Sequence, residues 1–423
     1  MVDLQWFRED PESLARALRR RGVEAPIERV TDLDTRRRAR LSEVEGLKAE
    51  RNRVSKAIAT MAATGRAAEI ERMRQIGERI EVLDAEVHAI ESELQEVLQW
   101  IPNRPSPETP DGVDDSDNVV MHQAGETPAW AFPPRPHYEL GPALGILDFE
   151  RGVKITGSRF YVLRSAGARL QRALIAWMLE RHRLHGYDEV YPPFVVRQQT
   201  MFSAGQLPKF NDNLYRDVED DLWLVPTAEV PLTGLHMDEI FAAEELPRRY
   251  AAYTPCFRRE KMSAGRDVRG IKRGHQFDKV EMYVFCAPED SPAELERMLA
   301  EAEATCVDLG LTHRVKALCA GDLGFSAARS FDVEVWAPGL GEWLEVSSVS
   351  TCTDFQARRA EIRYRPSGGK PRYVHTLNGS GLGVPRTLIA VLETGQQADG
   401  SVVVPEVLRP WLEGLDVIRP VAA

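Results

Sequence analysis

Two stretches near the N-terminus carry apolar residues at every third or fourth position, which is the spacing of one face of an α-helix. The first stretch, residues 31–61, has apolar side chains at Val44, Leu47, Val54, Ile58 and Met61, and Arg51 fills the position between Leu47 and Val54. The second, residues 70–97, repeats the pattern more regularly until Pro102 ends it. Residues 63–65 between them predict a turn. We therefore expect two antiparallel helices that form an arm of roughly 45 to 50 Å, at 1.5 Å per residue.

The rest of the chain has the pattern of a mixed α and β protein. Residues 1–28 predict a small helical cap, and residues 103–136, which are rich in Pro, Asp and Gly, predict a linker. Further helices are expected at residues 168–183, 291–309 and 386–393, and strands at residues 190–191, 222–225, 279–285, 331–336 and 343–349. Because the strands come in runs with few helices between them, we predict an α+β fold with an antiparallel sheet flanked by helices.

A chain of 423 residues is too long for one ordinary hydrophobic core. We expect an N-terminal helical domain over residues 1–102, with the arm at about residues 30–100. The linker at residues 103–136 then leads to a second domain over residues 137–423.

The formal net charge of -11 argues against general nucleic-acid coating, so any nucleic-acid contact is local and DNA is not an expected partner. The cysteines lack the paired spacing of a zinc site or a disulfide framework, and we expect buried thiols in a reducing compartment. They are Cys256, Cys286, Cys306, Cys319 and Cys352. No apolar run approaches the roughly 20 residues of a membrane span, so we expect a cytoplasmic protein without a membrane partner.

Residues 256–281 combine many cations with turn-forming glycines. The cations are Arg258, Arg259, Lys261, Arg266, Arg269, Lys272 and Arg273. Guanidinium groups bind phosphate oxygens as a planar fork and stay charged, so this composition suits a polyphosphate site. A solvated basic loop is the alternative. Phe277, Lys279 and Glu281 alternate at the end of the stretch and would share one face of a strand, which favours a pocket.

Three more polar clusters accompany this stretch. Thr227 and Glu229 place a hydroxyl and a carboxylate two residues apart. Residues 342–359 carry Glu345, Ser347 and Ser348, whose oxygens are of the kind that Mg²⁺ takes beside substrate phosphates, although Glu345 in a plain salt bridge is the alternative. Residues 378–383 are rich in glycine and lead to Arg386 at a helix start, a weak phosphate signal by itself.

The two arm helices differ in charge. The second helix is rich in glutamate, whereas the first holds Arg36, Arg37, Arg38, Arg40, Lys48, Arg51, Arg53 and Lys56. A basic face on a projecting arm suits a nucleic-acid backbone. Equally, these cations can pair with the glutamates across the arm.

In their order along the chain, these features resemble the seryl-tRNA synthetase family of class II aminoacyl-tRNA synthetases. The resemblance includes the arm and the following motifs, each quoted as it stands in this chain. They are GSRFY at 157–161, TAE at 227–229, FRRE of motif 2 at 257–260, SAGRD at 263–267, HQFDKVE at 275–281, TDFQARR at 353–359, and motif 3 with Arg386.

The resemblance implies an antiparallel catalytic sheet of about six or seven strands. It also implies a homodimer formed largely through motif 1, at about residues 168–193. The implied reaction uses ATP and Mg²⁺ to activate L-serine as seryl-adenylate, which is then transferred to the 3′ end of tRNA-Ser and commonly also of tRNA-Sec.

The resemblance further implies roles for individual residues. As catalytic groups, Arg258 grips the α-phosphate and the serine carboxylate, Glu260 holds the adenine or the tRNA end, and Arg386 reaches the γ-phosphate. Phe277 and Arg386 sandwich the adenine, and Glu345 and Ser348 hold Mg²⁺. The implied ATP-binding residues are Arg258, Arg259, Glu260, Gly274, Phe277, Lys279, Glu345, Val346, Ser347, Ser348 and Arg386. The implied serine-binding residues are Thr227, Ala228, Glu229, Arg258, Glu281, Asn378 and Ser380. On the arm, tRNA contacts are expected at Arg36, Arg37, Arg40, Lys48, Arg51 and Lys56.

The chain departs from the usual family wording at Lys261, Met262, Gly274 and Gly395. Gly274 matters most, because its backbone is expected near ATP. Two other functions compete with the ligase. One is a paralogue that activates an amino acid for a non-tRNA acceptor, which would typically lack the arm. The other is a non-catalytic synthetase-like binding protein, which would be expected to lose residues such as Arg258 and Arg386.

Overall fold

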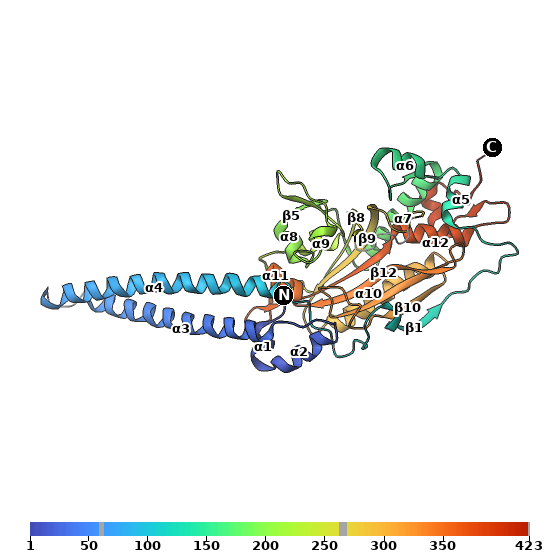
Figure 1. Ribbon diagram of the computed structural model, residues 1–423. Helices are drawn as coiled ribbons and strands as arrows, with labels where there is room; N and C mark the ends of the chain where they lie inside the picture. The colour runs from blue at the N-terminus through green and yellow to red at the C-terminus, as the bar shows by residue number, and fades with distance from the viewer. Residues whose placement is uncertain (59–62, 262–268, 422–423) are drawn as a thin grey trace. The chain divides into compact units, whose positions relative to one another are not determined.

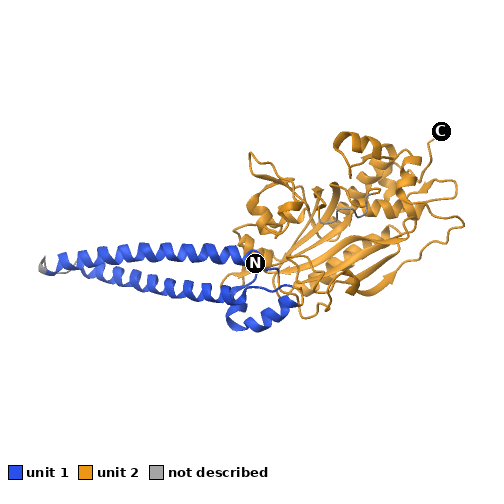
Figure 2. Ribbon diagram, viewed as in Figure 1, with its two compact units in different colours: residues 1–19, 23–102 blue, residues 20–22, 103–423 orange. Residues whose placement is uncertain are grey.

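The computed structural model describes residues 1–58, 63–261 and 269–421. The chain forms two compact units (Figure 2). The first unit contains residues 1–19 and 23–102, and the second contains residues 20–22 and 103–423. The predicted linker at residues 103–136 therefore lies inside the second unit.

The first unit is entirely helical. Two short helices, α1 (Leu4–Glu9) and α2 (Pro11–Arg19), precede the long helices α3 (Ile27–Ile58) and α4 (Ala63–Leu98), which run side by side (Figure 1). The 32 residues of α3 give a length of about 48 Å at 1.5 Å per residue. In the middle of the arm Val44, Ile80 and Leu83 are buried against each other, as the apolar spacing predicted.

The predicted turn at residues 63–65 is wrong, because α4 already begins at Ala63. Glycine lowers helix propensity without forbidding the conformation, and Gly65 lies within the first turn of a helix of 36 residues. Met61 lies outside the described residues.

The second unit is built on an eight-stranded sheet in the order β1-β10-β11-β12-β15-β9-β8-β4. The strands are β1 (Val119–Ala124), β10 (His313–Ala317), β11 (Arg329–Ala337), β12 (Glu342–Thr353), β15 (His375–Gly383), β9 (Gln276–Cys286), β8 (Arg248–Phe257) and β4 (Asp188–Val190). All neighbours are antiparallel except the edge strand β4, which runs parallel to β8. The α+β class is confirmed, but the sheet has eight strands instead of the expected six or seven. One edge strand, β1, comes from the predicted linker.

The helices that pack on the sheet include α7 (Ser165–Leu184), α10 (Ser291–Asp308) and α12 (Val384–Gly395). Strand β15 was not predicted, because its run of glycines has low β propensity. Its glycines allow close helix contact instead: a Cβ at Gly379 would lie 2.9 Å from Met298 Sδ of α10, and one at Gly381 would lie 2.2 Å from His182 Nε2 of α7. Asn378 and Ser380 alternate with these glycines and therefore point to the opposite face.

Smaller elements surround the sheet. Two-residue strands β2 (Leu147–Asp148) and β3 (Val162–Leu163) flank α6 (Phe149–Thr156), after α5 (His137–Ala143). Strands β5 (Val195–Arg197) and β6 (Leu222–Leu224) pair beside α8 (Gln198–Ser203) and α9 (Glu229–Gly234). A small sheet contains β7 (Ile240–Ala242), β13 (Arg363–Arg365) and β14 (Arg372–Tyr373). Helix α11 (Phe355–Ala360) comes directly before β13 in the chain. Near the C-terminus, β16 (Val402–Val403) pairs with β17 (Val417–Ile418). Short 3₁₀ turns occur at Asp115–Asp117, Asn211–Asn213, Ala243–Glu245 and Glu406–Leu412.

All five cysteines are buried and unpaired, as expected. Burial raises the pKa of the Cys256 thiol and so keeps it protonated. Among the described helices, none is both long and apolar enough to span a membrane.

Candidate active site

A cavity of about 640 Å³ opens on the second unit, and residues of β9, β12, β15 and the start of α12 line it together with nearby loops. Most of the predicted site residues meet here. They are Thr227, Glu229, Arg258, Glu260, Gly274, Phe277, Lys279, Glu281, Glu345, Val346, Ser348, Asn378, Ser380 and Arg386. The clusters are up to 159 residues apart in sequence, from Thr227 to Arg386, and the sheet brings them together.

Three predicted residues are not among those that line the cavity. Arg259 points to another loop, where its Nε donates to the carbonyl oxygen of Leu214 at 2.8 Å and its guanidinium lies 4.7 Å from the centre of the Tyr215 ring. Ser347 is buried and donates to the carbonyl oxygen of Ser380 at 2.7 Å. Ala228 is fully buried in a hydrophobic cluster and is the N-cap residue of α9.

Strand alternation explains this selection. Phe277, Lys279 and Glu281 of β9 all line the cavity, which confirms the predicted shared face. Val280 and Met282, the residues on either side of Glu281, belong to the core. On β12 the register shifts by one residue opposite Glu334, so that Val346 is the extra residue of a bulge. The bulge allows Glu345 and Ser348, three positions apart, to reach the same cavity.

One end of the cavity is cationic and aromatic. The Arg258 guanidinium lies 5.1 Å from the centre of the Phe277 ring, and its Nε donates to the carbonyl oxygen of Pro226 at 3.2 Å. Arg386, in the first turn of α12, donates from its NH1 to the carbonyl oxygen of Glu345 at 2.6 Å. These contacts orient both guanidinium groups while their remaining N–H donors stay available to an anion.

Glu345 and Ser348 supply hard oxygen atoms beside this end. Placement in the cavity wall opposes ionisation of Glu345, but the charges of Arg386 and Arg258 outweigh it and lower the pKa of the carboxyl. Its Oε2 lies 3.3 Å from Arg386 NH1, so the salt bridge expected as the alternative also forms. Burial, followed by the Glu345 carboxylate, raises the pKa of the neighbouring Asp332 well above its ordinary value.

The donor set fits Mg²⁺ held jointly by protein and phosphate. Among the described residues, no three His, Cys, Asp or Glu side chains form a cage that could hold a metal by themselves. One carboxylate and one hydroxyl are the protein share that Mg²⁺ takes in sites where substrate phosphates complete the shell. Asp332 strengthens the fit, because its buried Oδ1 has no hydrogen-bond partner within the described part of the chain.

The other end of the cavity is acidic and carries hydroxyls. Thr227 Oγ1 donates to Glu281 Oε2 at 2.9 Å, and Lys279 forms an ion pair with the same carboxylate. Burial, followed by the Glu281 charge, raises the pKa of Glu229 to about 7. Glu229 Oε1 accepts from Asn378 Nδ2 at 3.2 Å.

Sequence reasoning missed Gln356 and the loop at residues 324–327. Gln356 is fully buried, and its Nε2 donates to Glu229 Oε1 at 2.5 Å. It therefore orients Glu229, a predicted serine-binding residue, without lining the cavity itself. Gln356 lies within the TDFQARR motif, which was the available signal. The loop lines the cavity through Gly324, Phe325, Ser326 and Ala327 and carries no pattern that distinguishes it from any surface turn.

Two of the four departures from the family wording, Gly274 and Gly395, have a local cause. A Cβ at Gly274 would lie 2.9 Å from the carbonyl oxygen of Gln276, and one at Gly395 would lie 2.4 Å from that of Val403. Both backbones are therefore approached too closely for a side chain unless they shift. Lys261 donates its backbone N–H to Asn213 Oδ1 at 3.1 Å. Met262, the SAGRD motif at 263–267 and its Arg266 lie outside the described residues.

On the arm, several predicted tRNA contacts are engaged in ion pairs. Arg37 pairs with Glu91 at 2.9 Å, Arg40 with Glu86 at 2.8 Å and Lys48 with Asp84 at 3.2 Å, all across the two helices. Arg36 pairs with Asp32 of its own helix at 3.4 Å. Arg51 and Lys56 are exposed, and neither forms an ion pair with any residue that the structure describes.

Comparison with known proteins supports the family resemblance found in the sequence. The family model of the tRNA synthetase class II core domain (G, H, P, S and T) matches residues 209–395, and that of the seryl-tRNA synthetase N-terminal domain matches residues 1–105. The serine–tRNA ligase of Roseiflexus sp. is 63% identical over 422 residues, which cover 99% of this chain and 100% of the relative.

Solved structures agree. The seryl-tRNA synthetase of Pyrococcus horikoshii, complexed with ATP, superposes with a TM-score of 0.92 at 37% identity and full coverage of both chains. The cytoplasmic serine–tRNA ligase of Naegleria fowleri, in complex with AMP, gives a TM-score of 0.88 at 30% identity, with 100% of this chain and 99% of the relative covered.

These matches span the N-terminal domain as well as the core, which favours the ligase over an arm-less paralogue and over a non-catalytic binding protein. The chain belongs to the seryl-tRNA synthetase family and is a class II aminoacyl-tRNA synthetase, a serine–tRNA ligase.

Proposed function

We propose that this cavity binds ATP at its cationic end and L-serine at its acidic end, so that seryl-adenylate forms between them. The observation that carries the proposal is that one cavity joins both ends. The Arg258 charge acts on Glu229 at one end and on Glu345 at the other, so this guanidinium stands where the two substrates would meet.

At the nucleotide end, the Arg258 fork binds the α-phosphate and the serine carboxylate, and Arg386 binds the γ-phosphate. Phe277 and the Arg386 guanidinium hold the adenine ring by stacking, which suits a planar base. Glu260, Gly274, Lys279 and Val346 complete the nucleotide wall. Glu345 and Ser348 would hold Mg²⁺, which supplies charge neutralisation of the phosphates when bound. We retain Arg259 and Ser347 only as supports of this wall, because their side chains point elsewhere.

At the serine end, Glu229 and Glu281 bind the substrate ammonium group, and Thr227, Asn378 and Ser380 hydrogen-bond its polar atoms. Ala228, between Thr227 and Glu229 in the sequence, is buried in the core and does not contact the substrate. A carboxylate oxygen of serine attacks the α-phosphorus, and the bond to pyrophosphate breaks. The protein supplies no nucleophile for this step, because positioning and charge neutralisation carry adenylyl transfer.

Serine-dependent exchange of pyrophosphate into ATP by the purified chain tests the proposal. Serine, threonine and alanine are compared in parallel, with charging of tRNA-Ser as the second readout. Alanine is expected to be at least about 10³-fold poorer, because it leaves hydroxyl-binding groups unpaired in a buried site. Absence of serine-dependent exchange would refute the proposed chemistry.

The Glu229 carboxyl predicts a pH dependence. Because its pKa is raised to about 7, the fraction that carries the negative charge falls as pH decreases through that value. We expect kcat/KM for serine in the exchange reaction to be flat above about pH 8 and to fall about tenfold per pH unit below about pH 6.5, since this parameter reports the free enzyme. Glu229→Gln is expected to be slower and to lose this slope. A steep slope that persists in the variant would assign the titration to another group.

For the acceptor, we infer tRNA-Ser, with tRNA-Sec as a second substrate to be tested by charging the two transcripts side by side. We also infer a homodimer through motif 1. Its support is that β4 is a sheet edge next to two exposed apolar side chains, Leu184 at 66% and Tyr191 at 78% exposed. Light scattering of the purified chain is expected to give twice the mass of the chain, and a monomer at micromolar concentration would contradict this inference.

A further inference from the structure

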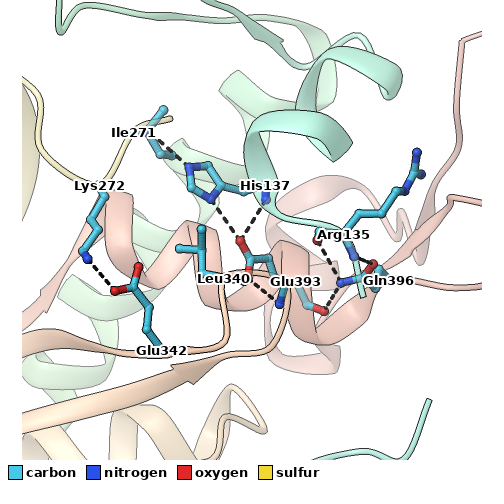
Figure 3. A network of polar contacts seen from close by, with 9 residues as sticks. Arg135, His137, Ile271, Lys272, Leu340, Glu342, Glu393 and Gln396 are labelled. Atoms are coloured by element: carbon cyan, nitrogen blue, oxygen red, sulfur yellow. Dashed lines mark hydrogen bonds and ion pairs between the residues drawn. The ribbon is translucent and has the colours of Figure 1, made fainter. Parts of the chain in front are cut away.

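A buried histidine and a buried glutamate contact each other through hydrogen bonds (Figure 3). Neither residue lines the cavity. His137 is the first residue of α5 and Glu393 belongs to α12, and both side chains are 0% exposed. Glu393 Oε1 accepts from the backbone N–H of His137 at 2.8 Å and from its ring Nδ1 at 3.0 Å. Glu393 Oε2 accepts from the backbone N–H groups of Gly339 and Leu340 at 2.9 and 3.0 Å.

Four N–H donors thus surround one carboxylate, which is what allows a charge to remain buried. The same partners assign the tautomer of the histidine ring. Nδ1 carries the hydrogen that Glu393 accepts, and Nε2 accepts the backbone N–H of Ile271 at 3.1 Å. The ring is therefore a directed link from Glu393 to the backbone of Ile271.

Ile271 is the first residue of a cavity-lining segment that continues through Lys272, Arg273 and Gly274. The Lys272 carbonyl oxygen accepts from Arg386 Nε at 3.5 Å. The side-chain Nζ of Lys272 lies 2.8 Å from Glu342 Oε2 (Figure 3). Glu342 starts the strand that carries Glu345 and Ser348. Lys272 consequently connects this segment to Arg386 of α12 and to Glu342 of β12.

The approach of this segment to the histidine is too close for any residue but glycine. Gly270 has φ +76, and a Cβ on it would lie 2.0 Å from His137 Nε2. At the opposite end of the link, a Cβ on Gly339 would lie 2.2 Å from the carbonyl oxygen of Arg135. Two glycines therefore permit the backbone contacts that the histidine and the glutamate make.

We propose that His137 is a positioning residue for ATP: by accepting the Ile271 N–H, it holds residues 271–274 and, through Lys272, the Arg386 guanidinium in the geometry that receives the nucleotide. This inference rests on the proposed function of the cavity. It assigns a role to a residue that touches neither substrate.

Two substitutions separate the two hydrogen bonds of the His137 ring, the one that Nδ1 donates and the one that Nε2 accepts. In His137→Asn, the side-chain N–H₂ replaces Nδ1 and still donates to Glu393, but nothing accepts the Ile271 N–H. In His137→Gln, the longer side chain places an acceptor near the position of Nε2. The control is His313→Asn, because His313 is also buried, at 1% exposed, and pairs with a carboxylate, with its Nε2 3.5 Å from Glu303 Oε1, on a strand that does not line the cavity.

The readouts are the equilibrium Kd for ATP of each full-length variant, the KM values for ATP and serine in pyrophosphate exchange, and the Tm. We expect His137→Asn to raise the Kd and KM for ATP about tenfold, the size of one lost hydrogen bond, with the KM for serine within about twofold. His137→Gln is expected to return the ATP values to within about threefold of the wild type. His313→Asn is expected to lower the Tm and leave both KM values unchanged.

The inference is overturned if His137→Asn leaves the Kd for ATP within about twofold of the wild type, or if both KM values change together. It is also overturned if the glutamine variant is as impaired as the asparagine variant. Loss of exchange in the wild type would instead count against the proposed function, and the ATP titration would still decide the role of His137.

Discussion

Replacing Arg258 by alanine is expected to lower kcat/KM for serine-dependent ATP–pyrophosphate exchange by about 10³-fold. This guanidinium acts on the carboxylates at both ends of the cavity and is oriented by Pro226 and Phe277. Its removal takes away the charge that would neutralise the reacting phosphate and the donor fork that would hold the serine carboxylate. Steady-state exchange with each substrate varied in turn measures the loss.

Arg258→Lys separates charge from geometry. Lysine keeps the positive charge but has no planar fork, so we expect a loss of about 10²-fold, with most of the effect on kcat. Arg259→Lys is the matched control, because this neighbouring guanidinium contacts Leu214 and Tyr215 and is not among the residues that line the cavity. It is expected to cost less than about fivefold. Equal losses at the two positions would contradict the orientation that the structure assigns to them.

Deleting residues 36–94 is expected to abolish charging of tRNA-Ser while serine-dependent exchange stays within about threefold of the wild type. The reason is that every residue lining the cavity belongs to the second unit, whereas the deleted helices belong to the first. The cut can be closed with a short glycine linker, because Arg37 and Glu91, near the two ends of the deletion, are in contact at 2.9 Å. Aminoacylation and exchange are measured on the same preparation.

A milder variant guards against a general loss of folding. Arg51→Glu with Lys56→Glu reverses two exposed cations that form no ion pair within the described residues, and the cross-arm pairs of Arg37, Arg40 and Lys48 stay intact. We expect the KM for tRNA to rise about tenfold and its salt dependence to weaken, as for lost phosphate contacts. Charging that survives the deletion at near-normal rate would show that the arm does not bind tRNA.

The apolar pattern of the arm predicts its helices, but its charge pattern does not decide what the cations bind. Its helices follow from three- and four-residue spacing, which is a local property of the chain. The role of its cations depends on which side chains of the second helix lie opposite, and a shift of one turn would change every partner. The structure confirms cross-arm pairing for Arg37, Arg40 and Lys48. It leaves Arg51 and Lys56 exposed, and tRNA binding by the arm stays a prediction.

The site shows a similar division. Strand alternation correctly placed Phe277, Lys279 and Glu281 on one face, because a period of two needs only local backbone geometry. It could not place Ser347 and Ser348, since the bulge at Val346 depends on pairing with β11. Gln356 and the loop at residues 324–327 reach the site through packing between elements far apart in the chain.

By itself, the amino-acid sequence determined the α+β class, the two-helix arm, the family and most of the residues that meet in the cavity, because these follow from local periodicity and from residue types in a fixed order. Tertiary structure alone decided that glycine-rich β15 is a strand, that Arg259 points away, and that His137 reaches Ile271. In each case the outcome depends on the close approach of another element: α7 and α10 against Gly381 and Gly379, Tyr215 against Arg259, and the His137 ring against Gly270.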